Sequence, residues 1–526
     1  MKNNFIDAIE KEAAWKVTEN GLEALNTTFD ACLDLFSTIG ALRTRSDAEI
    51  EKKFEAAYCE SPLTAMKTVF YARDIKEGLG ERRVAKVCLK HLASRHPEDI
   101  KANFGNIVKY GRFDDLYCLT DTAVEKEAYA YMKAVFAEDI KAYNEHKPYS
   151  LAAKWLKSAN GTDLETRRLG RLTAKYFGLS EATYRRALSK LRRGLDLIET
   201  QMTENKWDVI DFTKVPGGAV KKYTKAFCRH QKQRYFDYII AVKEGKKISV
   251  KAVDGTEKEV IAKINTKYLF PYEILEKYIS KHSWGNIFCL KDKRKYRADL
   301  EVMWAGLNDY IQGVESNTIV IADTSLSMAG RPMATSVGLG IYFAERNRGV
   351  FHNKFMTFSS KPSWVSLPEG ASLYDKLSVV PSICETTNLE AAFDLILNTA
   401  VSNGLSQEDM PKSLIIITDM EFDQCVVDNS TRCKEYPSHT TDMTFYDRMK
   451  ANYEVYGYKL PNITFWNASA RNNTYHVTKN IPHVRLVSGQ SPSVFRSLID
   501  GKAHTPYEVM LEVLSSSRYD SVVLGK

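Results

Sequence analysis

Residues 319–328 read "IVIADTSLSM", an apolar run that ends in an aspartate followed by two serines. Its first four residues are apolar and three of them are β-branched, which predicts a buried β-strand. Asp323, Ser325 and Ser327 follow directly, so their oxygen atoms would lie at the carboxyl end of that strand. Open α/β sheets bind their ligands at this edge. The stretch therefore predicts both a sheet of this class and a site built from oxygen ligands.

Further strands and helices alternate after residue 316. Short β-branched or aromatic runs predict strands at 353–360, 413–419, 462–469 and 484–489. Stretches with helical spacing of apolar residues lie between them at 333–347, 388–402 and 491–499. This alternation predicts a doubly wound, Rossmann-like α/β domain over 317–526, with a parallel sheet covered by helices on both faces.

The region before residue 316 has a helical pattern. "SPLTAMKTVFYARDI" begins with Ser61 and Pro62, which favour a helix start, and "HPEDIKANFGNIVKYG" ends at Gly111, which favours a helix stop. Many such units joined by short turns predict a HEAT-like array of stacked helical pairs over 1–316, although no fixed sequence period is present. An alternating pattern around Asp254-Gly255 predicts a small β-hairpin inserted near 247–265.

Composition limits the class of protein. A chain of 526 residues with 44% hydrophobic residues suggests two or more folded domains. The first residues are charged and no run of 18 apolar residues occurs, so we expect no signal peptide, no membrane partner and a cytoplasmic location. Its 9 cysteines are odd in number and have no zinc-like spacing, which favours reduced thiols.

Positive charge is concentrated in one segment. Residues 151–250 hold 22 Lys and Arg against 10 Asp and Glu, a surplus of 12 in a chain whose net charge is +8. Such cations neutralise phosphates, and the interleaved aromatic residues Tyr223, Phe227, His230 and Tyr235 could stack on unpaired bases. The alternative is a solvated helix face above core aromatics. The candidate RNA-binding residues are Arg185, Arg186, Lys190, Arg192, Arg193, Lys221, Lys222, Lys225, Arg229, Lys232 and Arg234.

Two further residues can join the oxygen ligands of the first strand. Asp419 ends the strand at 413–419, and Thr387 directly precedes a helix. Carboxylate and hydroxyl oxygens without a nearby His or Cys are hard ligands that suit Mg²⁺, with Mn²⁺ or Ca²⁺ as alternatives. The competing interpretation is that Asp323 and the serines only cap the next helix.

This set resembles a known site. Asp-x-Ser-x-Ser at 323–327 with Thr387 and Asp419 is similar to the metal-ion-dependent adhesion site of von Willebrand factor A domains, over about 317–526. The resemblance implies that Asp323, Ser325, Ser327 and Thr387 hold the ion, that Asp419 acts directly or through water, and that one position is left for an acidic group of a partner. Those domains commonly have Gly between the serines, where this chain has Leu326, so the loop backbone is where the two differ.

The N-terminal region carries a second resemblance. "FYARDIKEGLGERR" (70–83) and "YGRFDDLY" (110–117) resemble the helical-repeat module of the Ro autoantigen (TROVE) family, and residues 179–230 look more like a related, poorly characterised family with the same layout. The resemblance implies helical repeats that the A domain closes into a ring, with a basic hole and outer surface that bind single-stranded ends and small structured RNAs. For Arg73, Asp74, Glu81 and Arg82 we favour a salt-bridge network around a tight turn over RNA contact.

These patterns lead to two competing functions. The first is a non-catalytic RNA-binding scaffold whose cation site binds a partner or stabilises the ring. The second is a protein-interaction adaptor that grips an acidic residue of another protein and binds no RNA. A metal-dependent hydrolase is disfavoured, because no His or Lys lies near the ligands in sequence, and Glu421 and Asp423 are better interpreted as loop residues.

Overall fold

The computed structural model describes residues 12–251, 256–279, 297–311, 316–358, 362–381, 388–422, 444–498 and 504–525. The chain forms two compact units, and neither is one continuous segment. The first comprises 1–68, 270–296 and 309–516, and the second comprises 69–269, 297–308 and 517–526. The linear division near residue 316 stays a prediction. The two compact units instead group the first 68 residues with the C-terminal α/β region.

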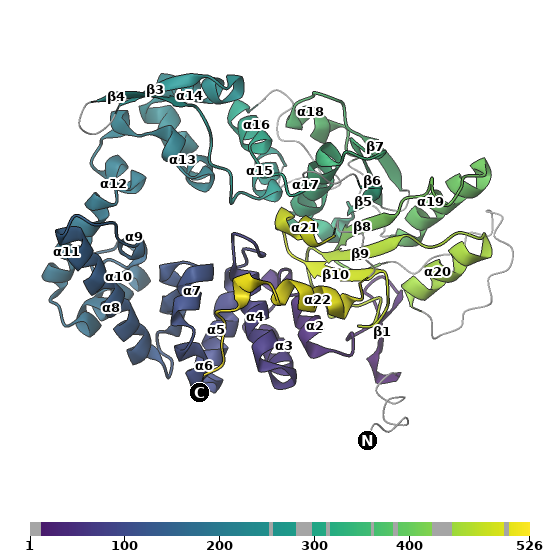
Figure 1. Ribbon diagram of the computed structural model, residues 1–526, viewed down its shortest axis with the longest axis horizontal. Coiled ribbons are helices and arrows are strands. Elements are labelled where there is room, and N and C mark those ends of the chain that lie inside the picture. Colours follow the sequence, from purple (N-terminus) through teal and green to yellow (C-terminus); the bar gives the residue numbers. More distant parts are fainter. Residues whose placement is uncertain are drawn as a thin grey trace. The chain divides into compact units, whose positions relative to one another are not determined.

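A six-stranded sheet forms the core of the first unit (Figure 1). Its order is β10-β9-β8-β5-β6-β7, with β7 antiparallel to β6 and the other pairs parallel. The strands are β5 (Thr318–Asp323), β6 (Lys354–Phe358), β7 (Ser363–Ser366), β8 (Ser413–Thr418), β9 (Asn462–Asn467) and β10 (Val484–Ser488). This confirms the prediction of a helical region followed by an α/β region. The sheet is mixed, whereas the sequence predicted a parallel one, because the short edge strand β7 runs antiparallel to β6.

Helices of the first unit pack on this sheet and on one another. They are α2 (Ala31–Phe36), α3 (Asp47–Glu60), α15 (Pro271–Tyr278), α17 (Arg331–Arg346), α18 (Leu373–Ser378), α19 (Leu389–Asn403), α20 (Phe445–Val455), α21 (Phe495–Leu498) and α22 (Pro506–Leu514). Helix α17 contacts β5, β6 and β8, and α15 contacts α17 in turn, whereas α22 contacts β10. From Met333 to Ala344 every residue of α17 is buried, which explains its almost uninterrupted small and apolar sequence.

An N-terminal hairpin also belongs to the first unit. Strands β1 (Trp15–Val17) and β2 (Glu23–Leu25) pair antiparallel, and Gly21 supplies the positive φ of 93° at the turn between them. The hydroxyl of Thr18 donates to the carbonyl of Phe422 at 2.7 Å. The hairpin turn is therefore fixed beside the chain that leaves β8.

Helices dominate the second unit. They are α5 (Arg83–Arg95), α6 (Pro97–Lys101), α7 (Phe104–Tyr110), α8 (Glu125–Asn144), α9 (Ala152–Trp155), α10 (Leu164–Phe177), α11 (Glu181–Gly194), α12 (Ile198–Thr203), α13 (Gly217–His230), α14 (Lys232–Glu244) and α16 (Ala298–Ala305), and α4 (Pro62–Arg73) crosses from the first unit. Neighbours along the chain pack together, α8 with α10 and α11, and α13 with α14 (Figure 1). Strands β3 (Lys247–Lys251) and β4 (Glu257–Ile261) pair antiparallel in the segment where the alternating pattern predicts a hairpin.

Residues 517–525 belong to the second unit, whereas the residues directly before them in the chain belong to the first. The side-chain amide of Asn103 donates to the carbonyl of Val523 at 2.6 Å, and that of Asn106 donates to the carbonyl of Ser521 at 2.7 Å. The Asp99 carboxylate accepts from the backbone N–H of Gly525 at 2.6 Å. This segment is thus hydrogen-bonded to residues more than 400 positions earlier in the chain.

Two expectations from composition concern membrane-spanning helices and the state of the cysteines. None of the helices in these ranges is long and apolar enough to cross a membrane. The cysteines among them, Cys32, Cys59, Cys88, Cys118 and Cys228, are free thiols.

Candidate functional site

Asp323 and Asp419 leave neighbouring parallel strands at the same edge of the sheet. Ala322 of β5 is opposite Ile417 of β8, so the residues that follow the two strands emerge together. Asp323 is 0% exposed and Asp419 is 1% exposed. The sheet therefore brings together two of the predicted metal ligands as buried carboxylates.

Hydroxyl groups complete this cluster. Ser325 lies with its hydroxyl 3.0 Å from that of Ser327, and its backbone N–H donates to the Asp323 carboxylate at 2.9 Å. The hydroxyl of Thr418, which the sequence did not single out, donates to the other Asp323 oxygen at 2.8 Å. Four of the five predicted ligands thus meet at one place, and Thr387 lies outside the described residues.

The loop that differs from the von Willebrand pattern needs no glycine. Leu326–Met328 form a single 3₁₀ turn, and Leu326 is not among the described residues with positive φ. Its side chain is 63% exposed and so does not crowd the cluster. The absence of Gly at this position is therefore compatible with the arrangement of the two serines.

Charge in this cluster is poorly compensated. Burial raises the pKa of Asp323, and the neighbouring Asp419 carboxylate raises it further. Burial also raises the pKa of Asp419, against a hydrogen bond from Ser327 and the charge of Arg471. Among the described residues, the Oδ2 atom of Asp419 is buried and accepts no hydrogen bond. Two buried carboxylates with hydroxyls beside them are hard oxygen donors that fit a divalent cation such as Mg²⁺.

A cation and an acid from elsewhere in the chain border the cluster. One terminal nitrogen of Arg471 lies 3.4 Å from Asp419 Oδ2 and 2.7 Å from Glu19 Oε2. The other oxygen of Glu19 accepts from the side-chain amide of Asn472 at 2.8 Å. Glu19 belongs to the N-terminal hairpin turn, so this contact joins segments that no local sequence pattern connects.

Two residues near Asp419 bear on the possibility of catalysis. Glu421 is 0% exposed, and its carboxylate accepts from the backbone of Glu19 at 2.8 Å and from the hydroxyl of Thr474 at 2.6 Å, which is a structural role. His476, which the sequence did not single out, is also 0% exposed and lies with Nε2 3.0 Å from the carbonyl of Met420, so Nε2 donates. Burial lowers the pKa of His476 to about 4. Asp423 lies outside the described residues.

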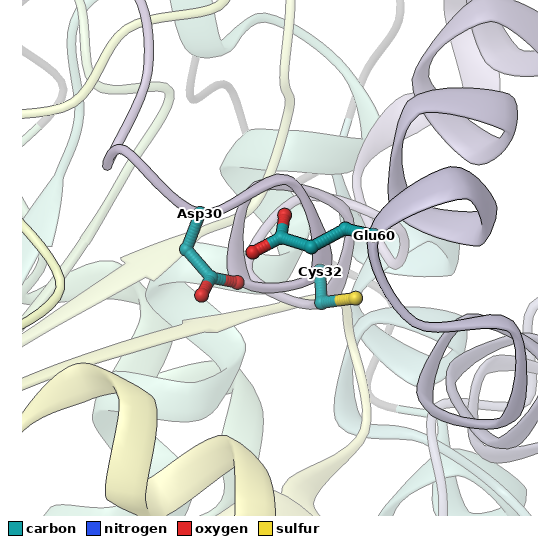
Figure 2. Close-up of side chains that lie close together, drawn as sticks. All are labelled: Asp30, Cys32 and Glu60. Atoms are coloured by element: carbon teal, nitrogen blue, oxygen red, sulfur yellow. The ribbon is translucent and has the colours of Figure 1, made fainter. Parts of the chain in front are cut away.

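A second acidic group lies near the start of α2 and the end of α3, formed by Asp30, Cys32 and Glu60 (Figure 2). Its members already have structural partners. Asp30 accepts from the backbone of Leu33 at 2.8 Å, Glu60 accepts from the backbone of Ala31 at 2.6 Å, and the Cys32 thiol donates to a backbone carbonyl. Burial raises the pKa of Cys32 to about 12, which opposes the thiolate that a metal needs. Helix capping accounts for this group without an ion.

The predicted RNA-binding cations on α11 differ in their exposure to solvent and in their hydrogen bonds. Arg185, Arg186, Lys190 and Arg193 are exposed, whereas Arg192 is half-buried. The Arg192 guanidinium donates to the carbonyls of Ala153 at 2.9 Å and Leu156 at 2.7 Å. Arg192 therefore supports the fold, and its exposed neighbours are available to a ligand.

The same distinction holds on α13 and α14. The side chains exposed to solvent are Lys222, Lys225, Arg229 and Lys232, and Lys221 is half-buried. Arg234 donates to the carbonyls of Trp207 at 3.1 Å and Ile210 at 2.5 Å. Phe227 and Tyr235 are 0% and 1% exposed, so they belong to the core and cannot stack on bases, while Tyr223 is half-buried.

One aromatic pair in this region remains accessible. The rings of Trp207 and His230 are stacked with centroids 4.0 Å apart and an angle of 5° between planes. His230 is exposed and Trp207 is half-buried. Sequence reasoning included His230 but missed Trp207, because the pairing depends on how the loop before α13 folds back.

A hollow of about 520 Å³ lies against α11. All five predicted cations of this helix line it, Arg185, Arg186, Lys190, Arg192 and Arg193. Tyr143 at the end of α8 and Ser158 and Asn160 after α9 form other parts of the wall. The sequence predicted the cations but not that they line one hollow.

The charged motifs at 70–83 and 110–117 form an ion-pair network. Arg73 lies 2.7 Å from the Asp115 carboxylate, and Arg82 lies 2.7 Å from Asp114 and 3.0 Å from Asp115. Asp74 is 0% exposed and pairs with Arg518, a residue of the C-terminal segment. These contacts favour the structural interpretation of both motifs.

Comparison with known protein families matches residues 18–160 and 150–307 to the domain of unknown function DUF2828. The match spans more than half of the 526 residues, so the chain belongs to this family. Residues 317–519 match a second domain of unknown function, DUF7788. The chain is also similar to the uncharacterized protein L728 of Acanthamoeba polyphaga mimivirus, at 27% identity over 535 residues that cover 94% of this chain and 86% of the viral protein.

Proposed function

We propose that this member of the DUF2828 family is a non-catalytic, cytoplasmic RNA-binding scaffold of Ro-like type. In this proposal the α/β region is a von Willebrand A-like domain with a divalent-cation site for partner binding or ring stabilisation. The observation that carries the RNA proposal is the set of exposed cations on α11, α13 and α14. Exposed guanidinium and ammonium groups neutralise phosphates with little loss of folding energy, because no buried ion pair has to be broken.

Single-stranded RNA is favoured over duplexes by the stacked pair of Trp207 and His230. The two rings cover each other on one side, so an unpaired base would stack on an outer face of the pair, and a duplex does not offer such a base without disruption. His230 is the last residue of α13, the helix that also carries Lys222 and Lys225. Phosphate-binding and base-stacking groups are therefore offered by one helix.

The cation site is supported by the two buried carboxylates at the sheet edge. Asp323, Ser325, Ser327 and Asp419 would hold the ion, with Thr387 as the fifth ligand that the resemblance implies. Mg²⁺ suits this donor set best, with Mn²⁺ or Ca²⁺ as alternatives. A bound ion would neutralise the two carboxylates and offer a position to an acidic group.

The two buried carboxylates at the sheet edge also favour a second candidate function, a protein-interaction adaptor that binds no RNA. Asp419 Oδ2 is buried without a hydrogen-bond donor among the described residues, which is the state expected of a ligand rather than of a helix cap. In this alternative the cation site grips an acidic residue of a protein partner, and the helical unit serves only as a platform. The two candidates differ in their response to salt and to loss of the cation.

The test is the affinity of the full chain for a hairpin RNA with a single-stranded tail, titrated against salt. The test variant changes Arg185, Arg186, Lys222 and Lys225 to Ala, and the control variant removes four exposed cations of the first unit, Lys52, Lys412, Lys450 and Lys459. We expect the test variant to bind more weakly and with a shallower salt dependence, by about 0.7 in logarithmic slope for each phosphate that the protein no longer neutralises. An equal decrease of affinity in both variants would overturn the placement of RNA on α11 and α13, and no binding by the unaltered protein would overturn RNA binding.

A further inference from the structure

The hollow against α11 has an unusual charge balance. Five cationic side chains line it, and none of its lining residues in the described part of the chain is Asp or Glu. Arg193 pairs with Glu204 at 3.3 Å, but Glu204 is not part of the wall. Among the described residues, acidic groups compensate the positive charge of the hollow only from outside its wall, which favours an anionic occupant.

The cations differ in how many contacts they make with the rest of the protein. Two hydrogen bonds to backbone carbonyls fix Arg192, and Lys190 is oriented by Asn144 at 3.1 Å and by the Tyr143 ring at 4.8 Å. Arg185 and Arg186 are exposed and make no ion pair with any described residue. Arg192 and Lys190 are thus preorganised, and the guanidinium groups of Arg185 and Arg186 can contact a ligand without first breaking an ion pair.

Neutral donors accompany the charges. Ser158, Asn160 and Ser189 also line the hollow, and Ser189 lies on α11 between the arginine pairs. The Ser158 hydroxyl donates to the Asn160 side-chain oxygen at 2.6 Å, which leaves the Asn160 amide nitrogen and the Ser189 hydroxyl as donors for a ligand. Hydroxyl and amide groups beside guanidinium forks are the donors that surround the oxygens of phosphate. The lining thus has the chemistry of a phosphate site rather than that of a carboxylate site with a single arginine.

The number of cations favours a terminal phosphate over an internal one. An internal phosphodiester carries one negative charge. A terminal phosphate or oligophosphate carries more charge, which matches several cations gathered at one place. A volume of about 520 Å³ is sufficient for a group of nucleotide size.

We propose that this hollow binds a terminal phosphate or oligophosphate group. Two sources offer this chemistry, the phosphorylated 5′ end of an RNA and a free nucleoside polyphosphate. With RNA as the source, the inference rests on the proposed function and assigns the end of the RNA that is bound. With a free nucleotide as the source, it is independent of RNA binding.

The test uses the full chain with two kinds of probe. Inorganic tripolyphosphate and ATP are titrated by calorimetry, and hairpin RNAs of one sequence with a 5′-triphosphate or a 5′-hydroxyl are titrated by fluorescence anisotropy. The variants are Arg185→Gln combined with Arg186→Gln, and Ser189→Asp, which introduces a negative charge into the wall. The matched control is Lys412→Gln combined with Lys450→Gln, because these exposed cations neither line the hollow nor belong to the proposed RNA-binding residues.

We expect tripolyphosphate to bind the unaltered protein and both hollow variants to weaken it at least tenfold, with the control unchanged. The 5′-triphosphate RNA should bind at least tenfold more tightly than the 5′-hydroxyl RNA, and the hollow variants should remove this difference. Binding of tripolyphosphate or ATP without binding of either RNA would support the hollow and overturn the RNA function. Equal binding of both RNAs, with no binding of tripolyphosphate or ATP, would overturn the hollow and leave the RNA function standing. Thermal unfolding curves that match the unaltered protein ensure that weaker binding by a variant does not come from unfolding.

Discussion

The carboxylates of Asp323 and Asp419 lie at the ends of adjacent parallel strands, both buried, and each raises the free energy of keeping the other ionised. Burial is the larger cause for Asp323, and the hydrogen bonds from Ser325 and Thr418 offset only part of it. A bound divalent cation would favour the ionised form of both carboxylates, because each negative charge would then contact the ion. Cation binding to this pair of carboxylates should therefore have a clear effect on the free energy of unfolding.

Mg²⁺ is expected to stabilise the protein through this pair. At a Mg²⁺ concentration of about 100 times Kd, the free energy of unfolding should rise by about 2.7 kcal/mol relative to EDTA. Asp419→Asn should remove this increase, because it deletes a ligand charge with little change of shape. The measurement is urea denaturation with Mg²⁺ or EDTA, with Glu369→Gln as an exposed control. An equal Mg²⁺ effect in all three proteins would refute the site.

Arg471 should compete with the cation. Its guanidinium is 3.4 Å from Asp419 Oδ2 and supplies positive charge where the ion would bind. Arg471→Gln is expected to tighten Mg²⁺ binding about tenfold, which corresponds to about 1.4 kcal/mol. Glu19→Gln should weaken it, because Arg471 then loses its other partner and acts on Asp419 alone. Calorimetric titration checks both, and changes of the same sign would contradict this relationship.

Arginines on α11 and α14 should separate into two classes. Replacing Arg192 or Arg234 by Gln leaves two backbone carbonyls without donors, so each change should lower the free energy of unfolding by about 1–3 kcal/mol. Arg185→Gln should change it by less than about 0.5 kcal/mol. Urea denaturation measures all three. Similar values for the three variants would show that the hydrogen bonds to these carbonyls do not stabilise the protein.

Asp74, the buried acid in the motif at 70–83, should anchor the C-terminal segment. Asp74 accepts from Arg518 at 2.7 Å and from the hydroxyl of Tyr519 at 3.3 Å. Asp74→Ala is expected to cost about 3–5 kcal/mol and to speed hydrogen exchange in residues 517–525. Glu77→Ala is the control, since Glu77 lies 3.9 Å from Arg518 with a side chain 52% exposed. Protection that is unchanged in both variants would show that other interactions hold the segment.

Asp394 on α19 should give stability a distinct pH dependence. Burial and the charge of Glu390 raise its pKa to about 6, against a hydrogen bond from Asn452. The folded state therefore binds more protons than the unfolded state between about pH 4 and 6, so this contribution to stability is lost as the pH rises through 6. Asp394→Asn should raise the free energy of unfolding at pH 7 by about 1–2 kcal/mol and flatten the profile.

The control for this profile is Asp409→Asn. Hydrogen bonds from Ser406 lower the pKa of Asp409, so its contribution to stability appears above its pKa and should be lost in the variant. Thermal unfolding from pH 4 to 8 measures both. Profiles for Asp394→Asn that run parallel to that of the unaltered protein would contradict the prediction.

Strands and their ends were predictable because the signal is local. The apolar runs of β5 and β8 identify strands, and the aspartates that follow them must share an edge in a parallel sheet. The edge strand β7 reads "SWVS" and has no such signal, so it was not predicted. Its pairing with β6 depends on the preceding strand rather than on its own composition.

Other parts of the candidate sites could not be predicted because they depend on distant contacts. Arg471 meets Glu19 across 452 positions, and neither lies in a motif. Trp207 gains its role only by stacking on His230. Cations on one helix face were visible in the sequence, but whether each is free, as Arg185 is, or bonded to carbonyls, as Arg192 is, depends on the packing of neighbouring helices.

The hydrogen bonds of residues 517–525 to Asn103, Asn106 and Asp99 have a consequence for synthesis on the ribosome. The second, helical unit begins at residue 69, and its last segment follows residue 516. Translation must therefore pass through the whole α/β region before the segment that completes the helical unit emerges. During that interval the side chains that will bind this segment, including the buried acid Asp74, lack the hydrogen bonds that it provides, and the nascent helices are exposed to chaperones and proteases.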